Sequence, residues 1–164
     1  MSNDKTHRGN ASQFYAAAEL CRRGLVAVVT LGNCPNTDIL CSNKEGTKFV
    51  HIQVKTFRPS DKDCMVGKKA ESSYGDNFFW ILCGIPEPDH KDQTFKYYII
   101  SAKEMSQNVK ETTTIWVETP GKKGQKHDIE NTIRAVALPP RKDLNGWDIS
   151  PHLNNWKLIQ DKLK

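Results

Sequence analysis

Two polar side chains stand out in an otherwise apolar segment, because their spacing places them side by side. Gln53 and Lys55 lie within residues 48–57, which are rich in β-branched and aromatic residues and are expected to form a strand. Side chains two positions apart on a strand point to the same face, whereas Ile52 and Val54 point to the other face. The segment therefore predicts an amide and an ammonium group side by side on one face of a sheet.

An aspartate on the preceding segment is expected to join this pair. Residues 37–42 are typical of a second strand, and residues 43–46 are typical of a hairpin turn that ends in glycine. Pairing across this turn brings Asp38 close to Gln53. A carboxylate, an amide oxygen and a backbone carbonyl such as that of Val54 are ligands that Mg²⁺ accepts, and Mn²⁺ suits similar sites. With an ammonium group beside them, these groups predict metal-dependent hydrolysis of a phosphodiester.

The rest of the sequence predicts an α/β domain that would hold this site. The expected strands are residues 25–31, 37–42, 48–57, 77–85, 95–100 and 113–118, and the expected helices are residues 10–23, 101–109 and 150–164. The first strand is expected to be buried, and the polar residues 58–76 are expected to form a loop. The order predicts a mixed sheet of about four to six strands flanked by helices. We expect one domain over residues 1–164.

The order of these elements resembles the PD-(D/E)XK nuclease superfamily. The resemblance rests on a helix followed by Asp38 and by Gln53-Val54-Lys55 on consecutive hairpin strands. Within that helix, residues 17–24 resemble the first helix of the family, which supplies an acidic residue in many members. The resemblance covers residues 9–57 well and becomes thin beyond residue 109. It implies a restriction-endonuclease-like fold that begins with one helix and three strands.

The resemblance also implies roles for individual residues. Asp38 would be the invariant metal ligand, Gln53 would fill the D/E position, Lys55 would be the lysine, and Glu19 would be the helix acid. Val54 would contribute its carbonyl oxygen to the metal. Gln53 departs from the family pattern because an amide is a neutral and weaker ligand. The helix position is left open between Glu19 and Gln13. His51 shares the face of Gln53, although a lone strand histidine is more often structural.

Basic residues flank the predicted site. The chain carries 24 Lys and Arg against 19 Asp and Glu, a formal net charge of +5. The residues expected to contact a phosphate backbone are Arg58, Lys62, Lys68 and Lys69 in the predicted loop and Lys122 and Lys123 in a basic turn at residues 121–127. Solvated surface lysines are the alternative interpretation.

Several classes of protein are disfavoured by the sequence. The five cysteines include no C-x-x-C and the five histidines no H-x-x-x-H, so a zinc site is not expected and the thiols are expected to stay reduced. No apolar run approaches the length of a membrane span, and residues 1–8 lack the apolar region of a secretory signal. We therefore expect a cytoplasmic protein without a membrane partner.

The sequence favours a metal-dependent DNA endonuclease that uses Mg²⁺ or Mn²⁺. Gln53 makes one alternative serious, namely a non-catalytic nucleic-acid-binding module on the same fold. A protein-interaction module on this scaffold is the other alternative. The substrate's structure, the biological pathway and a homodimeric state are left open.

Overall fold

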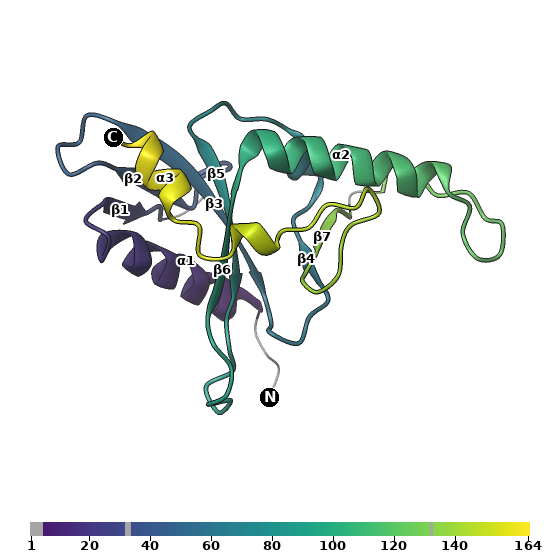
Figure 1. The fold of residues 1–164 in the computed structure, drawn as a ribbon, viewed down its shortest axis with the longest axis horizontal. Helices are drawn as coiled ribbons and strands as arrows, with labels where there is room; N and C mark the ends of the chain where they lie inside the picture. Colours follow the sequence, from purple (N-terminus) through teal and green to yellow (C-terminus); the bar gives the residue numbers. More distant parts are fainter. Residues whose placement is uncertain (1–4, 32–33, 132) are drawn as a thin grey trace.

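A computed structural model describes residues 5–31, 34–131 and 133–164, and its centre is a mixed sheet (Figure 1). The five strands follow the order β1-β2-β3-β5-β6. Their bounds are Val26–Val29 for β1, Ile39–Ser42 for β2, Phe49–Phe57 for β3, Phe78–Gly84 for β5 and Lys96–Ser101 for β6. Neighbouring strands pair antiparallel except β3 and β5, which are parallel. The predicted α/β fold with a mixed sheet is confirmed.

Helices cover both faces of this sheet. The α-helices are α1 (Lys5–Cys21), α2 (Ala102–Glu118) and α3 (Lys157–Lys162), and the short 3-10 helices are η1 (Lys68–Glu71) and η2 (Ser150–His152). A small antiparallel pair, β4 (Asp63–Met65) with β7 (Ala135–Ala137), lies beside α2 (Figure 1). No helix in the described ranges is both long enough and apolar enough to span a bilayer.

The first core joins α1 and α3 to one face of the sheet. On β3, Val50, Ile52 and Val54 alternate with the polar residues and are buried against this side. Leu20 of α1 and Ile159 of α3 are fully buried in the same cluster. Alternation along β3 therefore directs its polar side chains to the opposite face, as the sequence predicts.

The second core lies on the other face and corrects the prediction of a loop at residues 58–76. Cys64 of β4 and Val136 of β7 pair with each other and are buried with Trp80 and Met105. The predicted loop thus contains a strand and a 3-10 helix. The partner strand lies about seventy residues further along the chain, so no local pattern announces the pairing.

The prediction that the first strand is buried is wrong. β1 is an edge strand, and Val26 and Val28 are 45% and 56% exposed. Only its alternate residues Ala27 and Val29 pack against the first core. A short apolar run is typical of a buried strand, but an edge strand with one covered face carries the same residues.

The helix predicted at residues 101–109 is present but extends to Glu118. Ser101 is its N-cap, and the Ser101 hydroxyl accepts a hydrogen bond from the Glu104 amide at 3.2 Å. Residues 113–118, predicted as a strand, form its last turns. Their Thr, Ile and Val content favours a strand locally, but the capped helix is already anchored through Met105 and Val109 and continues.

The predicted closing helix over residues 150–164 is interrupted. After η2, Leu153 forms a β-bridge with Tyr98, and the Asn154 amide donates to the Tyr97 carbonyl at 2.6 Å. Asn154 adopts a φ of 53°. This segment therefore covers the edge of β6 before α3 begins, and the contact with the sheet overrides a continuous helix.

Gly84 on β5 is expected to tolerate no side chain. A Cβ at Gly84 would lie 2.6 Å from Cε2 of the Phe57 ring, which is itself buried. Gly84→Ala should therefore lower the free energy of unfolding by about 1–3 kcal/mol, as overpacking does. Gly9, inside α1, has nothing within 4 Å of its Cβ position.

Gly9→Ala is the matched control and should raise the stability by about 0.5–1 kcal/mol through helix propensity. Urea denaturation of both variants measures the two effects. Equal stability changes in the two variants would show that the Phe57 ring yields to the new methyl group.

Candidate functional site

Asp38 lies immediately before β2 and faces β3. Its amide donates to the carbonyl of Ile52 at 2.9 Å, and Ile39 pairs with Ile52, so Asp38 lies across from Gln53. The Asp38 Oδ2 atom accepts hydrogen bonds from the Val54 amide at 2.7 Å and from the Gln53 side-chain amide. The structure thus brings together the aspartate and the glutamine that the sequence places on adjacent strands.

Lys55 follows on the same face of β3 as Gln53. The positive charge of Lys55 favours the ionised form of the Asp38 carboxyl group, so the ammonium group lies within electrostatic range of the carboxylate. Burial has the larger effect and raises the pKa of Asp38 above its ordinary value, while the Val54 amide, Lys55, Gln53 and Lys69 oppose this rise. Asp38 is therefore a half-buried carboxyl group that a further cation would help to ionise.

The helix residue at this site is Gln13 and not Glu19. The Gln13 side-chain amide donates to Asp38 Oδ1 at 3.2 Å. Glu19 lies six residues further along α1, where Arg22 Nε donates to it at 2.9 Å and Arg23 forms a second ion pair. Burial raises the pKa of Glu19, but these arginines outweigh it and lower the pKa below the ordinary value. The expectation that Glu19 joins the site is therefore corrected.

A hydroxyl pair holds Gln13 in register with the strands. Ser12 is fully buried, and its hydroxyl lies 2.5 Å from the Thr56 hydroxyl on β3. The next helix residue, Gln13, is thereby fixed beside the start of β2. A buried serine on a helix needs a hydrogen-bonding partner. The sequence alone does not show that Ser12 is buried, so this contact could be recognised only from the structure.

His51 points to the side of Gln53 but has another partner. Its Nδ1 atom lies 3.3 Å from the Thr37 hydroxyl. No hydrogen bond joins His51 to Asp38 in the described part of the chain. The histidine therefore supports the segment before β2 rather than the carboxylate, in line with its interpretation as a structural residue.

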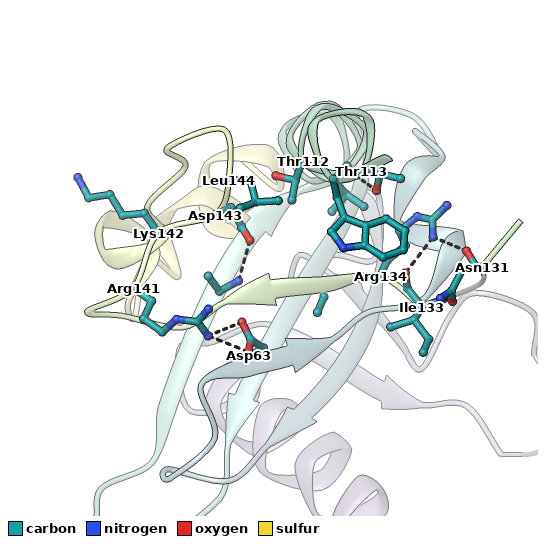
Figure 2. A pocket seen from close by; sticks show the side chains of 14 residues that line it. Asp63, Thr112, Thr113, Asn131, Ile133, Arg134, Arg141, Lys142, Asp143 and Leu144 are labelled. Carbon is teal, nitrogen blue, oxygen red and sulfur yellow. Dashed lines mark hydrogen bonds and ion pairs between the residues drawn. The ribbon is translucent and has the colours of Figure 1, made fainter. Parts of the chain in front are cut away.

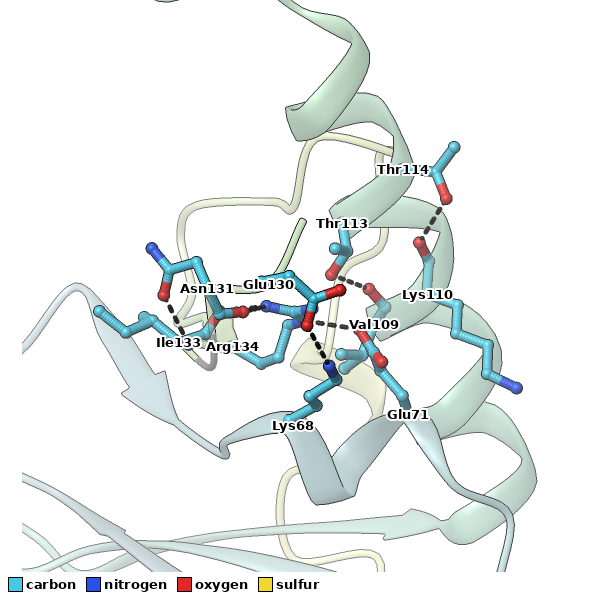
Figure 3. Close-up of polar contacts among 10 residues, drawn as sticks. All are labelled: Lys68, Glu71, Val109, Lys110, Thr113, Thr114, Glu130, Asn131, Ile133 and Arg134. Atoms are coloured by element: carbon cyan, nitrogen blue, oxygen red, sulfur yellow. Dashed lines mark hydrogen bonds and ion pairs between the residues drawn. The ribbon is translucent and has the colours of Figure 1, made fainter. Parts of the chain in front are cut away.

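The basic residues predicted to contact a phosphate backbone fall into two groups. Lys69 in η1 acts on Asp38, whereas Lys68 forms an ion pair with Glu130 at 3.8 Å (Figure 3). Arg58 and Lys62 are exposed on the segment that leads from β3 to β4. The exposed Lys122 and Lys123 lie in the loop beyond α2, at the end of the helix farther from β1 and β2 (Figure 1).

A separate cavity of about 470 Å³ lies elsewhere. It lies between α2, β7 and the loop that follows β7 (Figure 2). Charged groups line it, but Arg141 pairs with Asp63 at 2.8 Å and the buried Arg134 pairs with Glu71 at 2.5 Å (Figures 2 and 3). None of the residues around Asp38 lines this cavity.

The groups around Asp38 fit a weakly held divalent cation. No set of three or more His, Cys, Asp or Glu side chains gathers to hold a metal anywhere in residues 5–31, 34–131 and 133–164. Asp38 would therefore be the single anionic ligand of such a cation, and both of its oxygens accept amide hydrogen bonds. Mg²⁺ is commonly bound through one or two carboxylates with waters and substrate phosphates completing its shell. The site fits this mode, in which the substrate helps to hold the metal.

Comparison with known proteins identifies the fold. No protein-family model matches the sequence, and no curated protein matches it. A solved structure with a similar fold is that of a bacterial homing endonuclease, I-Ssp6803I. The TM-score is 0.54 over 97% of this chain and 94% of that chain, with 14% sequence identity. At this identity the similarity shows the fold alone, and the fold is nuclease-like.

Proposed function

We propose that this chain is a metal-dependent phosphodiesterase that cuts DNA, with a site of the PD-(D/E)XK type. One observation carries the proposal: Asp38 is held across β2 and β3 by Gln53 and the Val54 amide, and Lys55 lies on the same face of β3 as Gln53, close enough for its charge to act on the carboxylate. The nuclease-like fold and the homing-endonuclease neighbour support it. Mg²⁺ or Mn²⁺ is the proposed cofactor.

Each residue of the site has a proposed part. Asp38, the Gln53 side-chain oxygen and the Val54 carbonyl would hold the metal, which polarises a phosphate and lowers the pKa of bound water. Gln53 would have to turn its amide oxygen toward the metal, a rotation that leaves the shape of the side chain unchanged. Lys55 would stabilise the charge that develops on the phosphate oxygens. Gln13 would keep Asp38 in position.

Lys69 favours a nucleic acid near this site because it extends positive charge along the η1 segment. Arg58 and Lys62 are exposed along the same connection between β3 and η1. Lys122 and Lys123 lie in the loop beyond α2, at the end of the helix farther from β1 and β2, and are not assigned to this stretch of backbone (Figure 1). We therefore propose that the phosphate backbone runs along η1 and the segment before β4.

The proposal is tested by a cleavage assay on purified protein. Duplex, single-stranded and branched DNA are incubated with Mg²⁺, with Mn²⁺ or with a chelator, and Asp38→Asn is the matched inactive variant. We expect metal-dependent cutting that the chelator and the variant abolish. A wild-type protein that binds DNA but cuts none of the three forms would instead be a non-catalytic binding module on this fold.

The pH dependence of cleavage should report Asp38. The pKa of this carboxyl lies above its ordinary value, so the metal-free fold is stabilised by the protonated form, and this stabilisation is lost as the pH rises through the folded-state pKa. Metal binding needs the ionised form. We expect the acidic limb of the cleavage rate to lie above the range of an ordinary aspartate and to move to lower pH as Mg²⁺ increases. A limb that does not respond to Mg²⁺ would assign the titration to another group.

A further inference from the structure

A second cavity adjoins Asp38 on the side of α1. Its volume is about 290 Å³, near the lower end of the ~300–1,000 Å³ usual for ligand pockets. One wall is the face of α1 that carries Asn10, Gln13 and Phe14, spaced three and four residues apart. The opposite wall includes Leu31 from the segment after β1. Asp38 belongs to both this cavity and the proposed metal site, so the two share this residue.

The rim of this cavity is apolar and exposed. Phe14 is 61% exposed and Leu31 is 91% exposed. The next residue, Tyr15, by contrast packs its ring on Phe95 with centroids 4.5 Å apart. Phe14 has no aromatic ring contact of this kind among the described residues. Phe14 and Leu31 line the same cavity and are both exposed, and adjoining exposed apolar side chains of this kind can mark a ligand-binding groove.

The α1 wall of the cavity carries side-chain amides whose hydrogen-bonding groups are not all paired within the described part of the chain. No hydrogen bond joins the Asn10 side chain to any residue in the described part of the chain. The side-chain nitrogen of Gln13 donates to Asp38, and its side-chain oxygen has no hydrogen-bond partner among the described residues. Thr30, by contrast, donates its hydroxyl to the Thr37 carbonyl at 2.6 Å. Two amide groups therefore offer donors and acceptors beneath an aromatic rim, which matches the polar edge and the flat face of a nucleobase.

We propose that this cavity receives one unstacked nucleobase of the substrate strand, with Phe14 as its stacking surface. The inference rests on the proposed function, because a phosphate held at Asp38 and Lys55 places a neighbouring base at the cavity mouth. The charge agrees, since Lys55 and Lys69 act on Asp38, which lines the cavity, and can attract a phosphate backbone to its edge. The preferred substrate is then DNA with an unpaired nucleotide at the cleavage point, because a paired base cannot leave its stack without cost.

The test compares three fluorescent DNA probes of one sequence: a single strand, a duplex with one bulged base and a perfect duplex. Anisotropy is measured without divalent metal, so that cleavage plays no part. Wild-type protein should bind the two unpaired probes more tightly than the duplex. Phe14→Ala should weaken binding to the unpaired probes about tenfold, as loss of one base–aromatic stack does, and leave the duplex within about twofold. Phe14→Trp should restore the preference.

Phe49→Ala is the matched control, because Phe49 is 47% exposed and begins β3 at the end away from Lys55. Its probe affinities should equal those of the wild type. Equal affinity of Phe14→Ala and wild type for the unpaired probes would overturn the proposal. So would a change in sedimentation without a change in probe preference, which would place Phe14 between two copies of the chain. A protein that shows the Phe14-dependent preference but never cuts DNA would leave the base site standing and remove the phosphodiesterase.

Discussion

Lys55→Ala should reduce the rate of DNA cleavage by about two to three orders of magnitude, the usual loss when one stabilising donor of a transition state is removed. Lys55 faces the same side of β3 as Gln53, and its charge acts on the Asp38 carboxylate. Because its contribution is assigned to the developing charge, DNA affinity should change only a few-fold. Single-turnover cleavage and metal-free binding, measured on the same preparation, separate the two quantities.

Lys48→Ala is the control for this experiment. Lys48 precedes β3 and is exposed, and its ammonium group donates to the backbone carbonyl of Lys164. Its removal should leave cleavage unchanged. If Lys55→Ala lost affinity and rate in equal proportion, Lys55 would hold the ground-state phosphate rather than stabilise the transition state.

Gln53→Glu should bind Mn²⁺ or Mg²⁺ at least about tenfold more tightly than the wild type, because a second carboxylate then faces the cation. Without metal the same change replaces the hydrogen bond to Asp38 by the repulsion of two carboxylates. The variant should therefore melt below the wild type in chelator and above it in excess metal. Calorimetric titration and thermal melts in the two conditions give the affinity and this change of sign.

Asp38→Asn should be the opposite case. It removes the anionic ligand, so metal binding and cleavage should be lost, while the metal-free fold should be no less stable because burial already disfavours the ionised carboxyl. Gln53→Leu should lose less metal affinity than Asp38→Asn.

Gln160→Glu in α3 serves as the control for the charge that Gln53→Glu adds. Wild-type metal affinity in Gln53→Glu would rule out Gln53 as a ligand and leave it as an amide that orients Asp38.

The sequence patterns that predicted the structure correctly are those in which the paired residues lie close together in the sequence. The turn that ends at Gly46 joins β2 to β3, with a φ of 67° at that glycine, and alternation along β3 separates Ile52 and Val54 from Gln53 and Lys55. These features decide the strand pairing within about twenty residues. The position of Asp38 opposite Gln53 follows from them alone.

The features that sequence could not supply depend on distant contacts. β4 forms only because β7 pairs with it, and the C-terminal helix breaks at Leu153 because that residue bridges to Tyr98. The helix residue of the site was open for the same reason. Gln13 and Glu19 both lie on α1, and the packing of this helix on the sheet, including the contact of Ser12 with Thr56, decides which turn faces Asp38. Glu19 was favoured as the helix ligand because it carries a negative charge, but Arg22 and Arg23 on the same helix already pair with it.

The shared core of α1 and α3 has a consequence for biosynthesis. Leu20 is buried in one cluster with Ile159 and Leu163, so residues from both ends of the described chain complete the same layer. During translation, α1 can pack on β1, β3 and β5 once these strands have formed, because it contacts them directly. The part of the same face that α3 covers stays open until Leu163 has left the ribosome. The apolar layer on this face is therefore completed only at the end of synthesis of residues 5–163.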